Sequence, residues 1–481
     1  MNKQIHDVLI IGAGVTGTMI ARELSKYLLD VVILDKNNDA GDATSSANSA
    51  IIHSGYDPEP GSLKAKFNVL GNAKYPELVK QLDVPFIQCG SLTIAIEDEQ
   101  MPVLKELAER SKINGVEVKL LNKEEVLKME PHINPEVKGA LFAPTAGIID
   151  PFNLVVHAME NAIDNGVTFL RNHEVLAINK EEEIYKVKTS KEELFAKIII
   201  NAAGVKSDKI ASMVEDIDWA ITPRKGEYFL LDHYAEGLVR HTIFPLPSKK
   251  GKGVLVSQTS SGNYIVGPSS ELADPDDVAT DGATLSNIRK AASLMVPSIP
   301  FNQTIRVFAG ERATCTRHDF IIEYAKSDKH FINVAGIESP GLASSPAIAE
   351  YVVEELVKPI ITLRSNPKFN PCIKPYHRMY YLSEEDKLKA IKENPEFGQI
   401  ICNCEHISLG EIKEALSRSC PPVSIKGVKR RTRSGYGKCQ GGFCQPKVLM
   451  LLAEHYGVSP MEIPLAEEGS YIIDHEIKEA K

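Results

Sequence analysis

Four cysteines toward the end of the chain have the spacing of a metal or cluster site. They form two close pairs, C-x-C at Cys402 and Cys404 and C-x4-C at Cys439 and Cys444, separated by thirty-four residues. Four thiolates suit a [2Fe–2S] cluster or a structural Zn²⁺ ion. Zinc sites of four cysteines usually use C-x2-C pairs, so the spacing favours the cluster, with four unligated thiols as a third interpretation.

A second candidate for chemistry is one titratable ring in a run of small and apolar residues, ANSAIIHSG, residues 47–55. The ring is His53, and the ordinary interpretation is a core histidine whose nitrogens are hydrogen-bonded. An imidazole in an apolar setting also stays neutral near pH 7 and can accept a proton as a general base. The elements around this loop decide between the two.

The stretch DVLIIGAGVTGTMIARELSKYLLDVVILDK, residues 7–36, predicts a strand, a tight turn, a helix and a second strand. Gly12, Gly14 and Gly17 form G-x-G-x-x-G where the helix begins, and backbone N–H groups there bind a pyrophosphate. Asp35 ends the second strand and is placed to accept hydrogen bonds from a ribose. Because both strands, the helix and the acid accompany the glycines, we expect dinucleotide binding.

Two later segments favour FAD over NAD, and no second complete βαβ fingerprint indicates a separate nicotinamide domain. Residues 167–204 alternate like short antiparallel strands and end in an apolar strand and Gly204, which is typical of a β-meander returning to a parallel sheet. Residues 330–356 predict a strand, Gly336, the turn ESPGL and a long amphipathic helix. N–H groups at the start of that helix would stabilise negative charge on reduced flavin, although the same turn also suits a plain helix cap.

The composition is that of an ordinary enzyme. The 481 residues suffice for two or three domains, and the net charge of −9 argues against a nucleic-acid partner. No signal peptide precedes the first strand and no apolar run reaches the length of a membrane span, so we expect a cytoplasmic protein. Eight cysteines are too few for a disulfide scaffold and fit a reducing compartment.

Five further stretches are informative together: TSSANSAIIHSGYDPEPGSLKAKFNVLGN, PRKGEYFLLD, GKGVLVSQTSSGNYIVGP, FAGERA and GIESPGLASSPAIAEYV. They resemble the D-amino-acid-oxidase-type flavoprotein superfamily. Within it they are most similar to glycerol-3-phosphate oxidases and dehydrogenases, with L-2-hydroxyglutarate dehydrogenase as a near relative. The resemblance spans residues 5–360 and implies oxidation of glycerol 3-phosphate to dihydroxyacetone phosphate, with a 2-hydroxy acid as the alternative substrate.

The resemblance implies that His53 accepts the proton of the substrate hydroxyl while a hydride passes to FAD. Some members instead tether FAD through a histidine in this region, and the core histidine remains the third interpretation. Arg312, Lys252 and Ser339 match positions that line the substrate pocket, where two cations would bind the anionic end of a small alcohol. For Lys252 the alternative is a solvated lysine of a loop.

For Arg224 and Lys225, in PRKGEYF, we expect no role beyond the rim of the pocket. The remaining residues assigned to FAD come from the fingerprint and from the same resemblance. The full set is Gly12, Ala13, Gly14, Val15, Thr16, Gly17, Asp35, Lys36, Thr44, Ser45, Ser46, Asn48, Ser49, Val175, Gly204, Gly310, Arg312, Gly336, Ser339, Pro340, Gly341 and Leu342.

The pattern C.CE.IS..EI…RRTR.G.G.CQGGFC resembles the bacterioferritin-associated-ferredoxin-type [2Fe–2S] domain. That domain also ends the large subunits of anaerobic glycerol-3-phosphate dehydrogenases, so the resemblance implies a dehydrogenase whose electrons leave through the cluster to a protein acceptor or partner subunit. An electron-transfer adapter without its own substrate is the alternative of another class. We expect the basic run 429–433 to offset the charge of the cluster or to dock an acidic partner, with a solvated loop as the ordinary alternative.

These patterns together predict an α/β fold. An FAD-binding Rossmann-like domain and an α+β substrate domain are interleaved over residues 1–365. A linker with a short helix (366–398), a small helical [2Fe–2S] domain (399–456) and an acidic tail without a readable motif (457–481) follow.

Overall fold

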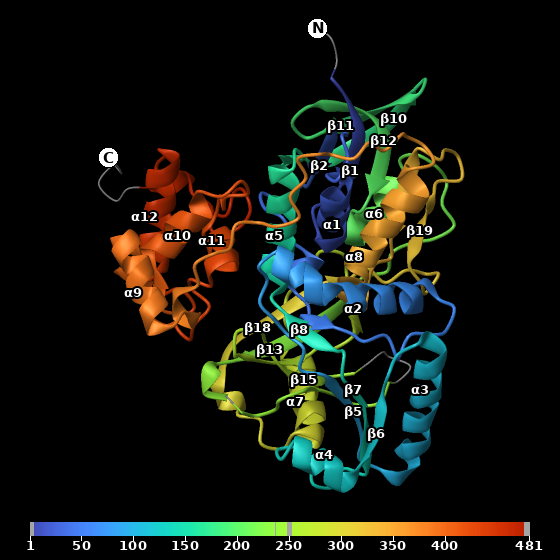
Figure 1. Cartoon of the computed structure of the whole chain (residues 1–481), viewed down its shortest axis with the longest axis vertical. Coiled ribbons are helices and arrows are strands. Elements are labelled where there is room, and N and C mark those ends of the chain that lie inside the picture. Colours follow the sequence, from blue (N-terminus) through green and yellow to red (C-terminus); the bar gives the residue numbers. More distant parts are fainter. Residues whose placement is uncertain (1–3, 236, 248–252, 476–481) are drawn as a thin grey trace.

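The computed structural model describes residues 4–235, 237–247 and 253–475. Within them, an eight-stranded sheet is built around the predicted fingerprint (Figure 1). Its strands are β1 (Ile5–Ile11), β2 (Val31–Leu34), β9 (Thr168–Leu170), β10 (Val175–Glu181), β11 (Ile184–Thr189), β12 (Glu193–Asn201), β19 (Ile321–Tyr324) and β20 (Phe331–Ala335). The strands β20, β12, β1, β2 and β9 pair in parallel, and β10 and β11 add an antiparallel edge. The β-meander expected before Gly204 is therefore present.

The parallel strands β1, β2 and β20 are largely buried on both faces, which explains their continuous apolar runs. Helices from distant parts of the chain pack on one face, and the edge strands and a short helix cover the other. The helices of this half are α1 (Val15–Leu24), α2 (Leu63–Gln81), α5 (Pro151–Asp164), α6 (Ser207–Ala211) and α8 (Gly341–Tyr351), which continues as a π-helical turn at Val352–Val357. The helix expected after the turn ESPGL is α8.

A nine-stranded sheet, interleaved with the first along the chain, forms the lower part of Figure 1 within the described ranges. Its strands are β5 (Ser91–Ala95), β6 (Lys119–Asn122), β7 (Gly139–Ala143), β13 (Arg224–Leu231), β14 (Thr242–Phe244), β15 (Leu255–Gln258), β16 (Tyr264–Gly267), β17 (Glu271–Leu272) and β18 (Thr304–Arg312). The helices α3 (Met101–Asn114), α4 (Lys123–Met129) and α7 (Gly282–Met295) pack on it. A small sheet of β3 (Ile51–Ile52), β8 (Gly147–Ile149) and β4 (Phe86–Ile87) completes this half.

The end of the chain forms a separate group of short helices beside α5 (Figure 1). We call residues 400–456 the C-terminal module. Its apolar core includes Ile412, Leu416, Val448 and Leu452, from the two amphipathic patterns of the sequence. The elements here are α9 (Glu384–Glu393) in the linker, then β21 (Ile400–Cys402), β22 (Ile407–Ser408), α10 (Leu409–Leu416), α11 (Ile425–Thr432) and α12 (Gln445–Tyr456).

The α/β fold with interleaved halves and a helical C-terminal unit is therefore confirmed. The residue boundaries proposed between the units stay a prediction. Among the described residues, no helix has both the length and the apolar composition needed to cross a membrane. The expected cytoplasmic location is a prediction that this observation alone does not test.

Candidate active site and cluster site

A cavity of about 1850 Å³ lies between the two sheets and is lined by residues from both. Ordinary small-molecule pockets measure about 300–1,000 Å³, so this one has room for a dinucleotide and a substrate together. Most of the residues proposed from the sequence line it. These are Gly12, Gly14, Val15, Thr16, Asp35, Lys36, Thr44, Ser45, Asn48, Ser49, His53, Val175, Gly204, Arg312, Ser339, Pro340, Gly341 and Leu342.

Some proposed cofactor residues stand behind the lining. Gly17 packs so closely that a Cβ atom would lie 1.9 Å from the carbonyl oxygen of Gly12, and Gly310 would meet the Ala47 carbonyl at 2.2 Å. These glycines shape the cavity instead of touching its contents. The proposed residues outside the lining are Ala13, Gly17, Ser46, Gly310 and Gly336. Lys252 lies outside the described residues.

The first turn of α1 faces the cavity, with Gly14, Val15 and Thr16 in the lining. Gly14 precedes the helix without a side-chain cap, and the N–H of Val15 donates to Oγ of Ser45 at 2.9 Å. Both oxygens of Asp35 accept backbone N–H groups, from Ala13 at 2.8 Å and Asn37 at 2.9 Å. Burial raises the pKa of Asp35 above its usual value. Each of its oxygens keeps a second lone pair, so contact with a ribose is compatible with these bonds.

His53 follows β3 and lines the cavity, half-buried. Its ring lies 5.8 Å from that of Phe244, and its Nε2 is 3.5 Å from Oγ of Ser339. The backbone carbonyl of His53 accepts hydrogen bonds from the side-chain amides of Asn68 at 2.6 Å and Asn72 at 3.1 Å. The loop is thus held by α2 while the ring faces the cavity, an arrangement that suits a reacting group better than a core histidine.

Two arginines stand side by side at the wall formed by the larger sheet. Arg224 of β13 is the direct cross-strand partner of Arg312 of β18. Both guanidinium groups donate to Oγ of Ser270, at 3.0 Å and 3.2 Å, and both line the cavity. Gly226 leaves space for Arg312, because a Cβ there would lie 2.8 Å from its Nη2. Arg224 was expected at most at the rim of the pocket; it lines the cavity beside Arg312, and a role in binding stays a proposal.

The four cysteines proposed as ligands lie in the C-terminal module as two contacting pairs. Sγ of Cys404 is 3.6 Å from Sγ of Cys439, and the thiols of Cys402 and Cys444 share a hydrogen bond. Within the described ranges, no three His, Cys, Asp or Glu side chains already converge as a metal site. Thiolates on one tetrahedral metal, with bonds of about 2.3 Å, lie about 3.7 Å apart, so the contacting pair has suitable spacing.

Within each contacting pair one thiol is favoured as the thiolate: the pKa is lowered at Cys402 and Cys439 and raised at their partners Cys444 and Cys404. The hydrogen bond from Cys444, together with backbone N–H groups of Gly435 and Glu405, lowers the pKa of Cys402 to about 6 against the effect of burial. Gly437 lies so close that a Cβ there would be 2.3 Å from the Cβ of Cys404. The donor set and its amide-rich loops therefore fit an iron–sulfur cluster held by Cys402, Cys404, Cys439 and Cys444.

Comparison with known families identifies both units. Residues 7–355 match the sequence profile described as "FAD dependent oxidoreductase", and residues 400–454 match the profile "BFD-like [2Fe-2S] binding domain". The chain belongs to the FAD-dependent oxidoreductase family. It is an enzyme of this family with FAD and a [2Fe–2S] centre as cofactors, so the zinc alternative is not supported.

Three relatives of this flavoenzyme are informative. A glycerol 3-phosphate dehydrogenase of Caloramator mitchellensis is 46% identical over 98% of both chains. A glycerol 3-phosphate oxidase of Mycoplasma genitalium is 35% identical over 76% of this chain and 99% of its own length. The solved structure of L-alpha-glycerophosphate oxidase from Mycoplasma pneumoniae, dithionite-reduced with FAD bound, covers 78% of this chain and all of its own, with 33% identity and a TM-score of 0.74.

The basic run 429–433 of the flavoenzyme has a different place from the one expected. It belongs to the helix α11 and its C-cap, and Arg430 and Arg431 are buried against acidic residues of the same chain. Arg433 pairs with Glu405 at 2.9 Å, and Glu405 directly follows Cys404, one of the four proposed cluster ligands. The run is therefore neither a solvated loop nor an open docking face for another protein.

Proposed function

We propose that this flavoenzyme oxidises glycerol 3-phosphate to dihydroxyacetone phosphate and passes the electrons to a protein acceptor. The observation that carries the proposal is the relative named glycerol 3-phosphate dehydrogenase, which is 46% identical over nearly the whole of both chains, C-terminal module included. The two adjacent arginines of the cavity support it, because a phosphate dianion is well matched by paired guanidinium groups.

In this proposal His53 accepts the proton of the substrate hydroxyl. Bound FAD would supply the acceptor for the hydride that leaves the carbon bearing this hydroxyl. Ser339, 3.5 Å from Nε2 of His53, holds the ring toward the cavity. A neutral imidazole is suited to this step because it takes a proton near neutral pH and returns it to water afterwards.

Arg312 and Arg224 bind the phosphate in this proposal, with Lys252 as a third cation. Both arginines are anchored by Ser270 and by backbone carbonyls, Arg312 through Ser269 at 2.9 Å and Arg224 through Ser270 at 2.7 Å. The anchoring keeps the planar groups in place before the substrate arrives, which limits the entropy lost on binding. They fix the distance between the phosphate and the carbon that is oxidised.

The choice of a protein acceptor over O2 rests on the C-terminal module. The Mycoplasma genitalium relative, named an oxidase, matches over 99% of its own length but only 76% of this chain. The Caloramator mitchellensis relative, which matches over 98% of both chains, is named a dehydrogenase. The [2Fe–2S] centre supplies one-electron transfer. Cys404 is exposed and the neighbouring loop carries Phe443, 81% exposed, so a partner protein can approach the cluster side of the module.

The substrate is tested by anaerobic reduction of the purified holoprotein with one compound at a time. Glycerol 3-phosphate and L-2-hydroxyglutarate are added separately at equal concentration, and the visible flavin band is followed. We expect bleaching by glycerol 3-phosphate alone. Bleaching by the hydroxy acid alone would contradict the proposal, and bleaching by neither, with dithionite still effective, would instead favour an electron-transfer adapter.

A further inference from the structure

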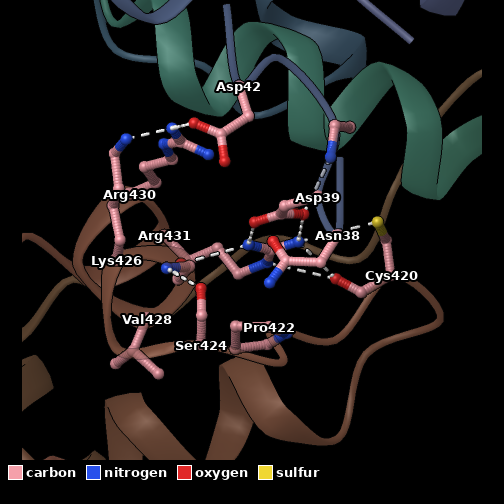
Figure 2. A network of polar contacts seen from close by, with 12 residues as sticks. Asn38, Asp39, Asp42, Cys420, Pro422, Ser424, Lys426, Val428, Arg430 and Arg431 are labelled. Carbon is pink, nitrogen blue, oxygen red and sulfur yellow. Dashed lines mark hydrogen bonds and ion pairs between the residues drawn. The ribbon is translucent and has the colours of Figure 1, made fainter. Parts of the chain in front are cut away.

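The loop of residues 36–46 has two faces with different neighbours. On one side Lys36, Thr44 and Ser45 line the FAD cavity, and Ser45 accepts the N–H of Val15 at the start of α1. On the other side the loop lies against the C-terminal module and the segment that follows it (Figure 2). Whatever holds this outer side therefore also sets the position of the residues that face the cofactor.

The central contact of the outer side is a buried ion pair between Asp39 and Arg431. Nη1 of Arg431 donates to Oδ2 of Asp39 at 2.7 Å and Nη2 donates to Oδ1 at 2.8 Å, and the side chains are 1% and 0% exposed. The remaining donors of Arg431 reach carbonyl oxygens of its own module, from Cys420 and Gly427. Burial raises the pKa of Asp39, but Arg431 outweighs that effect and lowers it overall.

Further contacts extend the connection along the loop. Asp42 accepts from Arg430 and, at 3.1 Å, from Lys426, both of α11. Asn38 donates to the carbonyl oxygen of Ala466 at 2.6 Å, in the tail for which no motif was found. Figure 2 shows these side chains converging from the loop and from α11. The polar side chains at positions 38, 39 and 42 thus all bind the C-terminal part of the chain.

We infer that the iron–sulfur module positions the FAD-binding loop, with Arg431 and Arg430 as positioning residues for FAD. The buried pairs fix the 36–46 loop from outside in the conformation that its inner face needs for the cofactor. Coupling of this kind is reciprocal, so bound FAD also stabilises the docking of α11. The Mycoplasma genitalium relative named an oxidase aligns over 99% of its own length but with only 76% of this chain. It is therefore too short to include the C-terminal module, and the outer contact distinguishes this chain from it.

The first test is the affinity for FAD after the pair is removed. Deflavinated Arg431→Met and Asp39→Asn/Arg431→Met proteins are titrated with FAD, and the quenching of flavin fluorescence gives Kd. We expect Kd to rise about 10-fold or more in both, within the range usual for coupled sites. The double variant matters because it leaves no unpaired charge buried. Recovery of the original Kd in the double variant would overturn the inference.

Arg418→Met provides the matched control. Arg418 forms another buried pair between the module side and the flavin half, with Glu160 of α5 at 3.3 Å, and neither residue belongs to the 36–46 loop. Its removal is expected to leave Kd for FAD within about twofold, since it weakens docking without reaching the cofactor. An equal loss of affinity in Arg418→Met would show that general undocking, not the loop contact, is responsible.

A second measurement uses the unmodified chain and is independent of how the variants fold. Amide hydrogen exchange is compared between the holoprotein and the deflavinated protein, both with the cluster intact by visible absorption. We expect faster exchange in residues 425–432 without FAD, while residues 409–416 of the same module stay unchanged. Equal exchange of 425–432 in both forms, or a uniform rise across the module, would overturn the inference.

Discussion

Replacing His53 by asparagine is expected to abolish most of the substrate oxidation while FAD binding is retained. The backbone of His53 is held by the amides of Asn68 and Asn72, and these bonds do not depend on the side chain. Asparagine keeps a polar group of similar reach but cannot accept a proton near neutral pH. General-base catalysis contributes about 10²- to 10⁴-fold, so the barrier is expected to rise by about 2.7–5.4 kcal/mol.

The assay is the anaerobic rate of flavin bleaching after mixing with saturating glycerol 3-phosphate in a stopped-flow instrument. This step contains the chemistry without the later transfer of electrons to an acceptor. The matched control is His330→Asn, because His330 lies outside the cavity and contacts Asp328 at 2.9 Å. We expect the control to bleach at the original rate.

Two results would refute the reasoning about His53. A His53→Asn protein that is loaded with FAD and bleaches within about threefold of the original rate would exclude a base at this position. Flavin that stays with the denatured original protein, but separates from the denatured variant, would show that His53 is the point of covalent attachment. We expect acid denaturation to release FAD from both proteins.

Three further predictions follow from the site and the core. Arg312→Lys should lower kcat/KM for glycerol 3-phosphate about 10- to 100-fold, and Arg224→Met about 10-fold, because bidentate contacts to the phosphate are lost. Steady-state kinetics measures both values. An unchanged kcat/KM for Arg224→Met would show that this residue does not contact the phosphate. The original protein should contain about two iron atoms per chain and no zinc, and Cys444→Ser should contain less iron and still no zinc. Elemental analysis of both proteins checks this. Burial lowers the pKa of His157 to about 3, so only the unfolded chain takes up its proton between about pH 6.5 and 3. The free energy of unfolding therefore falls as the pH is lowered from 7, by about 2 kcal/mol at pH 5. Urea titration at several pH values should show this loss, and the free energy of unfolding of His157→Gln should depend less on pH over the same range. An equal pH dependence in both proteins would assign the loss to other groups.

The local part of the site was predictable from the sequence. Gly12, Gly14 and Gly17 define a conformation and a spacing within a few residues, so the strand, turn and helix around them follow from short-range sterics. His53 and Ser339 were assigned through stretches that resemble known flavoproteins. Their 3.5 Å contact joins segments 286 positions apart, which depends on how α8 packs against α2.

The contacts between residues far apart in the chain could not be predicted from a single sequence. Arg224 meets Arg312 only because β13 and β18 pair in one particular register, and a shift by one residue would point the two side chains to opposite faces. Arg431 belongs to a basic run that was expected to offset the charge of the cluster or to dock an acidic partner. Its buried partner Asp39 stands 392 positions earlier, so the sequence did not indicate this pair. Periodicity and composition contain no information on which acid a buried arginine will meet.

Electron paramagnetic resonance of the holoprotein after anaerobic addition of glycerol 3-phosphate shows whether substrate electrons reach the cluster. We expect the signal of a reduced [2Fe–2S] centre to appear as the flavin band bleaches, and Cys444→Ser to bleach without this signal. Bleaching of the unmodified protein with no reduced cluster, together with reoxidation by O2 as fast as turnover, would contradict the account and indicate an oxidase.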